Sequence, residues 1–310
     1  MHLMDSRKMD EYKLKVEDLV GQPIDKSAYE TATMRREPWY QAGSGDKLSQ
    51  FAVCPACDNP IQLVGLYHLP ANVSGPYGKH TTSGIKGIAS LDTEARDHCP
   101  NFKPRQHQKT DRKTKFDGVP RRIVKILIEQ FDRVVYILER QTQVQLSDKA
   151  LRGMLERYKG EQGYLYTGAT LRNVPWIFAY MSDATPLFAQ RVNGNTELTN
   201  AIRTQVPAAN VDAKGRLGAA LLPAGKGAFI DLKMSFIQHR IVKESEASGL
   251  KESMVLVVSH SQKGVLKDVF KQELPFETRW FDNLIQMPDD DPRRRMEKVD
   301  LAKEVLGDLL

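Results

Sequence analysis

A pair of cysteines separated by two residues, Cys54 and Cys57, constrains this chain more than any other feature of its sequence. Two thiolates at this spacing on a tight turn can both face one ion, and their geometry suits tetrahedral Zn²⁺. Cys99 offers a third thiolate in a second turn beside Pro100. Because the chain has only these three cysteines, we expect a metal centre and not a framework of disulfides.

The fourth ligand is expected from the histidines of the same region, which are His68, His80, His98 and His107. His80 is preferred because loop-forming residues flank it and it lies between the two cysteine turns. His98 is adjacent to Cys99, and neighbouring residues rarely point at the same ion. Four protein ligands close the coordination sphere of zinc, so the predicted centre is structural and not catalytic. Its predicted ligands are Cys54, Cys57, His80 and Cys99.

Two other interpretations of the cysteines remain open. A redox-active pair at Cys54 and Cys57 would need the βαβ surroundings of a thioredoxin-like fold, which the loop-rich sequence does not supply. Buried thiols without any ligand are the second alternative. Zinc is the preferred cofactor.

The segment from residue 51 to residue 118 is rich in proline and glycine and has little helical periodicity. A structureless segment of this length inside a folded chain needs something else to organise it. We therefore expect residues 1–118 to form an N-terminal region that the metal holds together, with the zinc module itself at about residues 51–105.

Helical periodicity begins after this region. Apolar residues recur at steps of three and four from Ile123 to Leu138, which predicts one amphipathic helix. Ser147 is a suitable N-cap for a second helix that ends near Gly160. The short connection between the two predicts an antiparallel helix pair over residues 119–161.

From Tyr164 onward the apolar pattern changes to a period of two, which is typical of strands. Most connections are too short for repeated βαβ crossovers, so we expect a mixed or antiparallel sheet over residues 162–310 and an α+β fold. The predicted strands are Tyr164–Thr167, Trp176–Met181, Leu187–Val192, Leu217–Leu222, Ala228–Phe236 and Met254–Ser259. The predicted helices are Thr196–Thr204 and a terminal helix at about Arg293–Leu309, while Phe276–Ile285 fits a helix or a strand.

A run of basic residues follows Cys99 directly. A cationic segment beside a zinc module suits contact with a phosphate backbone, because each neutralised phosphate releases counterions. The predicted nucleic-acid contacts are Lys103, Arg105, Lys109, Arg112, Lys113, Lys115, Arg121 and Arg122, and Lys125 continues the run. Phe102, His107 and Phe116 are candidates for stacking on the bases of a single strand. A solvated loop, or a loop that docks on an acidic protein, explains the same run without nucleic acid.

Asp231 and Lys233 lie in a predicted strand and are the only candidates for catalytic residues. Metal-dependent nucleases use such a pair, with the acid on Mg²⁺ and the lysine beside the attacking water. The second carboxylate would have to come from Asp183 or Asp212. The simpler interpretation places Asp231 and Lys233 on the exposed face of the strand.

The formal net charge of +6 favours polyanionic partners over cationic ones. No apolar run approaches the ~20 residues of a membrane span, and no secretory signal follows Met1, so we expect a cytoplasmic protein without a membrane partner. The leading hypothesis is a zinc-binding, non-catalytic nucleic-acid-binding protein, with DNA or RNA left open. The alternatives are a metal-dependent nuclease or phosphodiesterase built on the C-terminal sheet, and a structural subunit of a protein complex that docks through the basic loop or the terminal helix.

Overall fold

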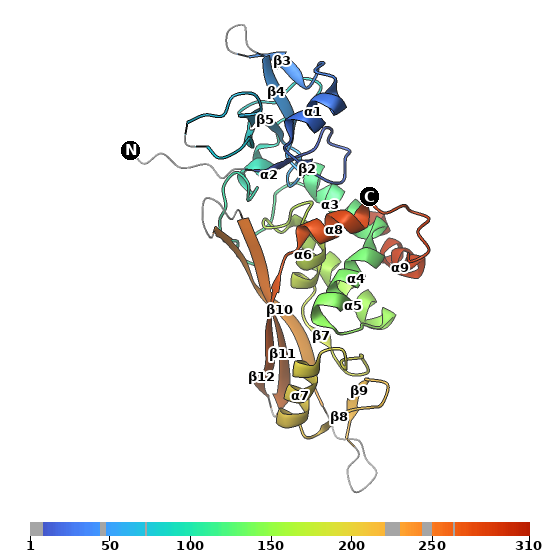
Figure 1. Cartoon of the computed structure of the whole chain (residues 1–310). Helices are drawn as coiled ribbons and strands as arrows, with labels where there is room; N and C mark the ends of the chain where they lie inside the picture. The colour runs from blue at the N-terminus through green and yellow to red at the C-terminus, as the bar shows by residue number, and fades with distance from the viewer. Residues whose placement is uncertain (1–8, 44–47, 72, 221–229, 244–249, 263) are drawn as a thin grey trace.

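The computed structural model describes residues 9–43, 48–71, 73–220, 230–243, 250–262 and 264–310. Over these ranges the chain is elongated, with the N-terminal part at one end, helices in the middle and a long sheet along one side (Figure 1). Helices and antiparallel sheets are both present, as the α+β expectation requires. None of the described helices is long and apolar enough to cross a membrane.

The N-terminal part is built on an antiparallel sheet in the order β3-β4-β5-β6. Its strands are β3 (Tyr40–Ala42), β4 (Leu48–Val53), β5 (Pro60–Val64) and β6 (Tyr77–His80), accompanied by β1 (Glu11–Tyr12), β2 (Gln22–Pro23), α1 (Lys26–Thr33) and α2 (Thr93–Asp97). The buried rings of Tyr12, Tyr29 and Tyr40 pack in a row beside this sheet. The expectation of a structureless segment over residues 51–118 is therefore wrong for residues 51–53, 60–64 and 77–80, which pair by backbone hydrogen bonds in β4, β5 and β6.

The predicted helix from Ile123 to Leu138 is in fact two helices, α3 (Gly118–Glu129) and α4 (Phe131–Thr142). They meet at Gln130, whose backbone leaves the helical region. The apolar positions remain nearly in phase across this single residue, so periodicity alone does not reveal the break. The second predicted helix is α5 (Asp148–Gly160), and the side chain of Ser147 caps it by accepting a hydrogen bond from the Ala150 amide.

The helices of the middle layer do not form the expected antiparallel pair. The main helical neighbour of α5 is α9 (Met296–Leu306), which also packs on α3 and α4. Ion pairs between exposed side chains, such as Arg152 with Glu304, line this contact. The terminal helix is therefore covered on one face by its own chain, and η2 (Gly307–Leu309) follows it.

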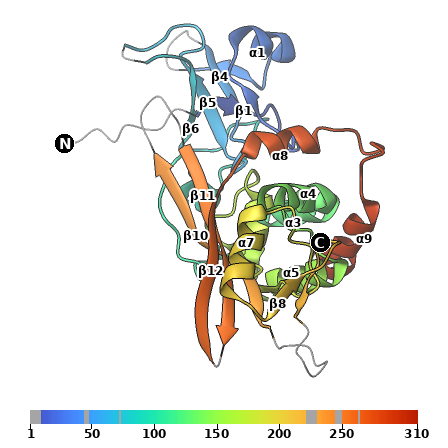
Figure 2. The same cartoon turned by 60° about the horizontal axis from the view of Figure 1, so that its bottom comes forward.

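The long sheet is antiparallel and has the order β12-β11-β10-β7. Its strands are β7 (Thr185–Pro186), β10 (Leu232–Lys243), β11 (Leu250–Gln262) and β12 (Val265–Pro275), and a small separate sheet pairs β8 (Ala209–Val211) with β9 (Leu217–Ala219). Helices cover one face of the long sheet, among them α6 (Val174–Tyr180) and α7 (Thr196–Gln205), while α8 (Thr278–Ile285) leads away from β12 over the helical layer (Figure 2).

Several strand predictions in this half need correction. Residues 164–167 begin in the short helix η1 (Gly163–Leu165), residues 187–192 are irregular, and residues 176–181 belong mostly to α6. Every residue of α6 is buried, so its sequence carries no helical period to recognise. The predictions at residues 217–222, 228–236 and 254–259 overlap β9, β10 and β11, although residues 221–229 lie outside the described part. Strand β12 was not predicted.

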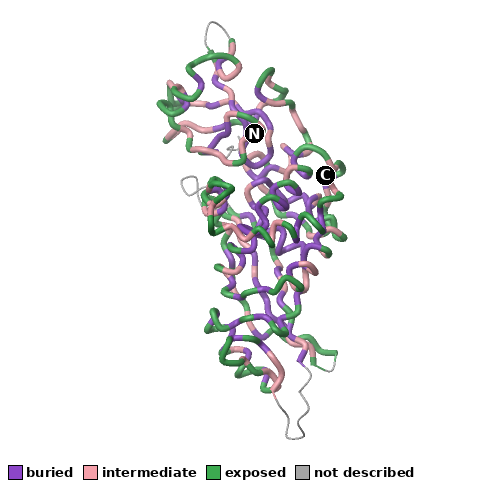
Figure 3. The backbone as a smooth tube through the Cα atoms, turned by 90° about the vertical axis from the view of Figure 1, so that its right-hand side faces the viewer, coloured by how far each residue is buried: buried purple, intermediate pink, exposed green. Residues whose placement is uncertain are grey.

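Buried apolar residues form one cluster that extends from Met9 to Leu306. Figure 3 shows buried stretches in the N-terminal part, in the helices and in the sheet. The division into regions at residues 118 and 161 stays a prediction. The N-terminal part and α3 adjoin the candidate site.

Candidate metal centre

The three cysteines and one histidine come from four different segments of the N-terminal part. Cys54 directly follows β4, Cys57 lies in the turn before β5, His80 ends β6, and Cys99 comes shortly after α2. The sheet register pairs Val53 with Pro60 and Ile61 with His80, which brings the end of β6 beside the turn. Strand pairing thus places the histidine next to two of the thiols.

Residues 54–59, which we call the knuckle, are fixed by local hydrogen bonds. The Asp58 amide donates to the Cys54 carbonyl at 3.0 Å, and the Cys54 amide donates to the Asn59 carbonyl at 2.8 Å. Asp58 adopts a left-handed conformation with φ of 58°, which closes the turn. The side-chain amide of Asn59 donates to the Cys57 carbonyl at 3.1 Å and approaches its sulfur at 3.5 Å. The knuckle therefore presents both thiols on the same side.

The four side chains lie close enough together to share one metal ion. Their ligand atoms all lie within 4.8 Å of one another, and all four residues are buried. The sulfurs of Cys54 and Cys99 are 3.8 Å apart, and Cys57 Sγ lies 3.3 Å from His80 Nε2. Zn–S bonds of about 2.3 Å and Zn–N bonds of about 2.0 Å give tetrahedral edges of about 3.8 Å and about 3.5 Å. The cluster is compatible with a metal ion, and with zinc in particular.

The other histidines considered from the sequence lie elsewhere. His68 is exposed, His98 Nδ1 contacts the Arg105 guanidinium, and His107 is buried with its Nδ1 2.8 Å from the hydroxyl of Thr167. His80 instead faces the thiols, and the ring of Phe102 packs edge-on against it at 5.4 Å between centroids. The order of preference among the four histidines thus agrees with the observed cluster.

The thiols are electrostatically unequal in the protein alone. Burial raises the pKa of each, but hydrogen bonds from Cys57 and Cys99 and the nearby His80 hold the pKa of Cys54 well below its ordinary value. Burial, together with hydrogen bonding to the Cys54 thiolate, raises the pKa of Cys57 and Cys99 well above the ordinary value. A second thiolate is therefore unfavourable here unless a cation joins the cluster, and a metal ion is such a cation.

Lys113 is buried behind the metal cluster and is not part of an exposed cationic surface. It is 4% exposed, and its ammonium group donates to the Ala169 carbonyl at 2.6 Å. Burial lowers the pKa of Lys113 to about 8, while the negative charges of Cys57 and Asp92 oppose this change. The predicted contact of Lys113 with a phosphate is thus wrong, because its ammonium group is buried and bonded within the protein.

Asp58 connects the knuckle to α3. Its carboxylate forms an ion pair with Lys13, which is fully buried, and another with Arg122 at 2.5 Å. Arg122 also donates to the backbone carbonyls of Val16 and Asp18. Burial raises the pKa of Asp58 and lowers that of Lys13, and their mutual attraction offsets only part of each change. Loss of one partner would leave a buried charge uncompensated.

The rest of the basic segment divides into engaged and exposed side chains. Lys109 pairs with Asp183, and Arg112 donates to the backbone carbonyls of Glu161 and Lys109. Lys103 and Arg105 are exposed beside α2, where Lys103 lies 3.6 Å from Asp97. The remaining exposed cations of the segment are Lys115, Arg121 and Lys125.

The aromatic residues proposed for base stacking already have partners inside the fold. Phe102 packs on His80 and lies under the cationic groups of Arg96 and Lys103. Phe116 packs on Tyr164 at 4.9 Å between centroids. His107 is buried. These rings are therefore not free platforms for the bases of a single strand.

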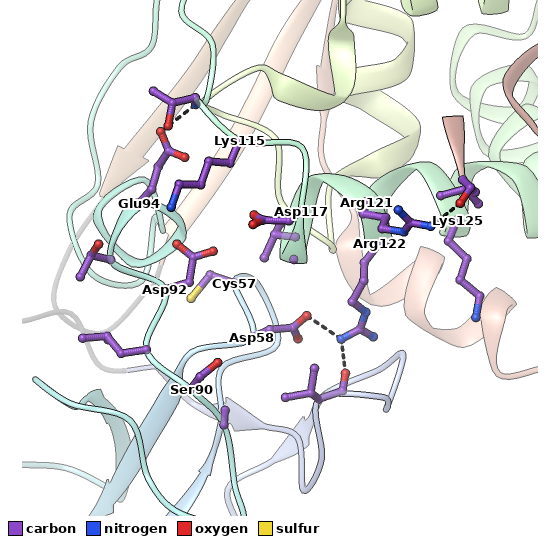
Figure 4. Close-up of a pocket in the computed structure, with 18 residues that line it drawn as sticks. Cys57, Asp58, Ser90, Asp92, Glu94, Lys115, Asp117, Arg121, Arg122 and Lys125 are labelled. Atoms are coloured by element: carbon purple, nitrogen blue, oxygen red, sulfur yellow. Dashed lines mark hydrogen bonds and ion pairs between the residues drawn. The ribbon is translucent and has the colours of Figure 1, made fainter. Parts of the chain in front are cut away.

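A cleft with a volume of about 1050 Å³ opens beside the knuckle. Cys57 and Asp58 line one side of it, residues 89–94 together with residues 114, 115 and 117 form further walls, and the start of α3 completes it (Figure 4). Arg121, Arg122 and Lys125 enter the lining from α3, and Lys115 enters from the preceding segment. The sequence placed these cations in one run but gave no sign that they share a cavity with the metal-binding turn.

The catalytic candidates are not assembled into a site. Lys233 lies 3.4 Å from Asp231 at the start of β10, while Asp183 accepts a hydrogen bond from the Phe236 amide further along the same strand. Asp212 accepts hydrogen bonds from the amides of Lys214 and Arg216 in the β8–β9 turn. Among the described residues, the Cys/His cluster is the single group of potential metal ligands, so nothing gathers a second carboxylate beside Asp231.

Comparisons of the chain with protein-family models, with curated proteins and with solved structures found no match.

Proposed function

We propose that the chain is a zinc-binding protein and that the centre formed by Cys54, Cys57, His80 and Cys99 is structural. The observation that carries the proposal is a buried cluster in which three sulfurs and one imidazole nitrogen lie within 4.8 Å of one another. Three thiolates and a neutral histidine form one of the ligand sets that select zinc. With four protein ligands, no coordination position remains for a substrate or water, so the role is to hold the four segments together.

Metal analysis of the purified chain tests this proposal. We expect one zinc per chain, and one tetrahedral Co²⁺ with thiolate absorption bands after substitution. Cys54→Ser and His80→Gln should each lower the zinc content, whereas His98→Gln should leave it unchanged as the matched control. A metal-free chain with full stability, or equal zinc loss in His98→Gln, would contradict the assignment.

We further propose that the protein binds nucleic acid and that this binding is non-catalytic, with cytoplasmic location as part of the same proposal. The support is the set of exposed cations next to the metal cluster, which are Lys103, Arg105, Lys115, Arg121 and Lys125. Such side chains bind phosphates through charge, so affinity should fall steeply as salt rises. Fluorescence anisotropy with single- and double-stranded DNA and RNA across a salt series tests this; no binding at low salt would exclude it.

The alternatives receive less support from the geometry. The nuclease hypothesis lacks a carboxylate cluster in the described part of the chain, as set out above. Docking of a partner through the terminal helix competes with intramolecular packing, because Leu301, Ala302 and Leu306 of α9 are already buried against the chain. The exposed basic loop remains available for an acidic protein partner, and size-exclusion chromatography of the purified chain with copurifying proteins distinguishes that case.

A further inference from the structure

Eight charged side chains line the cleft beside the metal cluster. The acidic ones mostly form hydrogen bonds or ion pairs within the protein, whereas the basic ones mostly do not. On the acidic side, Asp58 is paired with Lys13 and Arg122. Asp92 accepts a hydrogen bond from the Ala95 amide at 2.9 Å, and Glu94 accepts one from the Thr114 amide at 2.8 Å. Three of the four carboxylates in the lining therefore already have partners within the protein.

The fourth carboxylate, Asp117, precedes α3. Its side chain makes no capping hydrogen bond to the helix, and Figure 4 shows it beside the cavity between Lys115 and Arg121. Of the four acidic side chains in the cleft, Asp117 is thus the one that contributes least to hydrogen bonding in the local structure. Replacing it should disturb the fold little and change the charge of the cleft by one unit.

The basic side of the cleft is mostly uncommitted. Lys115 has no carboxylate within ion-pair distance among the described residues. Arg121 donates to the main-chain oxygen of Leu310, the last residue of the sequence, which also lines the cleft. Lys125 lies 3.9 Å from Glu129, but both side chains are exposed, and solvent screens such i,i+4 pairs on a helix surface so that they are weak. Arg122 is the cation of the cleft that forms a close ion pair with a carboxylate of the lining, that of Asp58. Three cations therefore have donor capacity left for an external anion.

The positions of these cations suit a chain of anions. Arg121 and Lys125 are four residues apart on α3, so they project from the same face about 6 Å apart along the helix axis. Lys115 enters from the wall on the other side of Asp117. A ligand that carries several phosphates in a row can contact all three cations. The nearby aromatic rings already pack on other rings of the protein, so they do not add stacking on bases.

We propose that this cleft is a phosphate-binding site in which Lys115, Arg121 and Lys125 hold the backbone of a nucleic acid without reading its bases. The inference rests on the proposed nucleic-acid binding and specifies its location and chemistry. A free polyphosphate presents the same chemistry, so the test separates the two sources. Within the lining of this cleft, the Asp58–Arg122 ion pair connects α3 to the knuckle.

The experiment compares variants of equal net charge. The cleft variant combines Lys115→Gln, Arg121→Gln and Lys125→Gln. The matched control replaces three exposed cations of α5, α7 and α9, with the substitutions Lys149→Gln, Arg203→Gln and Lys303→Gln. Anisotropy with labelled oligonucleotides is measured across a salt series, and calorimetry uses inorganic tripolyphosphate. We expect the cleft variant to bind at least tenfold more weakly and to lower the salt slope by about 2–3, and the control to change affinity less than threefold.

Asp117→Asn provides a variant in the opposite direction. It should bind phosphate ligands two- to fivefold more tightly, because it removes a negative charge beside Arg121. Weaker binding by Asp117→Asn would indicate that the cleft takes a cationic ligand and would overturn the inference. Equal loss in the cleft variant and its control would also overturn it, while nucleic-acid binding itself would survive. Binding of tripolyphosphate alone, lost in the cleft variant, would keep the site and remove the nucleic acid.

Discussion

The carboxylate of Asp58 and the guanidinium of Arg122 form an ion pair of 2.5 Å that joins the knuckle, residues 54–59, to helix α3. Asp58 immediately follows the thiol of Cys57, and Arg122 lies in the second turn of α3. Lys13, which is fully buried, shares the same carboxylate. The turn, the β1–β2 connection and the helix therefore meet at one side chain, and a change in the turn reaches α3 directly.

Removing the metal should loosen the start of α3 as well as the turn. Without an ion, the buried thiols lose the cation that draws them together, and Asp58 loses its fixed position. Hydrogen exchange of the amides at residues 54–59 and 118–125 should become faster by at least tenfold after chelation. The same amides in β11, far from the cluster, should change less. Faster exchange in the turn with unchanged exchange in α3 would show that the ion pair transmits nothing.

Replacing Asp58 by alanine should destabilise the chain by about 3–5 kcal/mol, because it leaves the ammonium group of Lys13 buried without a partner. The combined Lys13→Met and Asp58→Ala variant should recover part of that loss, since the fully buried ammonium group is then removed, while the half-buried Arg122 lacks its carboxylate in both variants. Arg152→Gln, which breaks an exposed pair with Glu304, is the control and should change the stability far less, because solvent screens that pair. Urea unfolding curves measure all three.

The residues of the Cys/His cluster could be predicted from the sequence because much of the information is local. Cys54 and Cys57 show their geometry through spacing alone, and His80 and Cys99 could be added because few other candidates exist in the region. The strands β4, β5 and β6 that bring them together were missed. Proline and glycine are common in this stretch, and they hide short strands whose pairing depends on partners distant in sequence.

The roles of the basic residues could not be predicted in the same way. Lys113 and Lys115 are two positions apart in one cationic run, yet the first is buried behind the thiols and the second lines the cleft. The composition of a segment gives its charge, but it does not show which side chains become buried in the fold. Strand β12 was missed for a related reason: its exposed residues are mostly charged, and its pairing with β11 supplies the order.

Lys113 should matter for the metal cluster and not for nucleic acid. Its buried ammonium group lies in the field of Cys57 and Cys99 and offsets part of the negative charge of a zinc–thiolate centre. Lys113→Met should therefore weaken zinc retention against a competing chelator by about tenfold, an effect typical of groups that surround a metal site. Lys115→Met is the neighbouring control and should retain zinc normally. Equal retention in both variants would remove this role from Lys113.

His107 should make the chain sensitive to mild acid. Burial lowers its pKa from the ordinary 6.5 to about 4, with the charge of Arg105 contributing. The unfolded chain therefore takes up a proton near pH 6.5, while the folded chain resists it until about pH 4. The contribution of the neutral imidazole to the free energy of unfolding is complete above pH 6.5. It is lost as the pH falls from 6.5 towards 4. Its full size is about 3 kcal/mol.

Urea unfolding of the wild type and of His107→Gln, measured from pH 7.5 to pH 4.5 with excess zinc, isolates this contribution. Acid also protonates the thiols and releases metal, but that loss is common to both proteins and cancels in their difference. The wild type should lose stability more steeply below pH 6.5 than the variant, whose glutamine can still pair with the hydroxyl of Thr167. Parallel curves would mean that the imidazole becomes protonated in the folded chain, so that the ring is accessible to water despite being only 9% exposed.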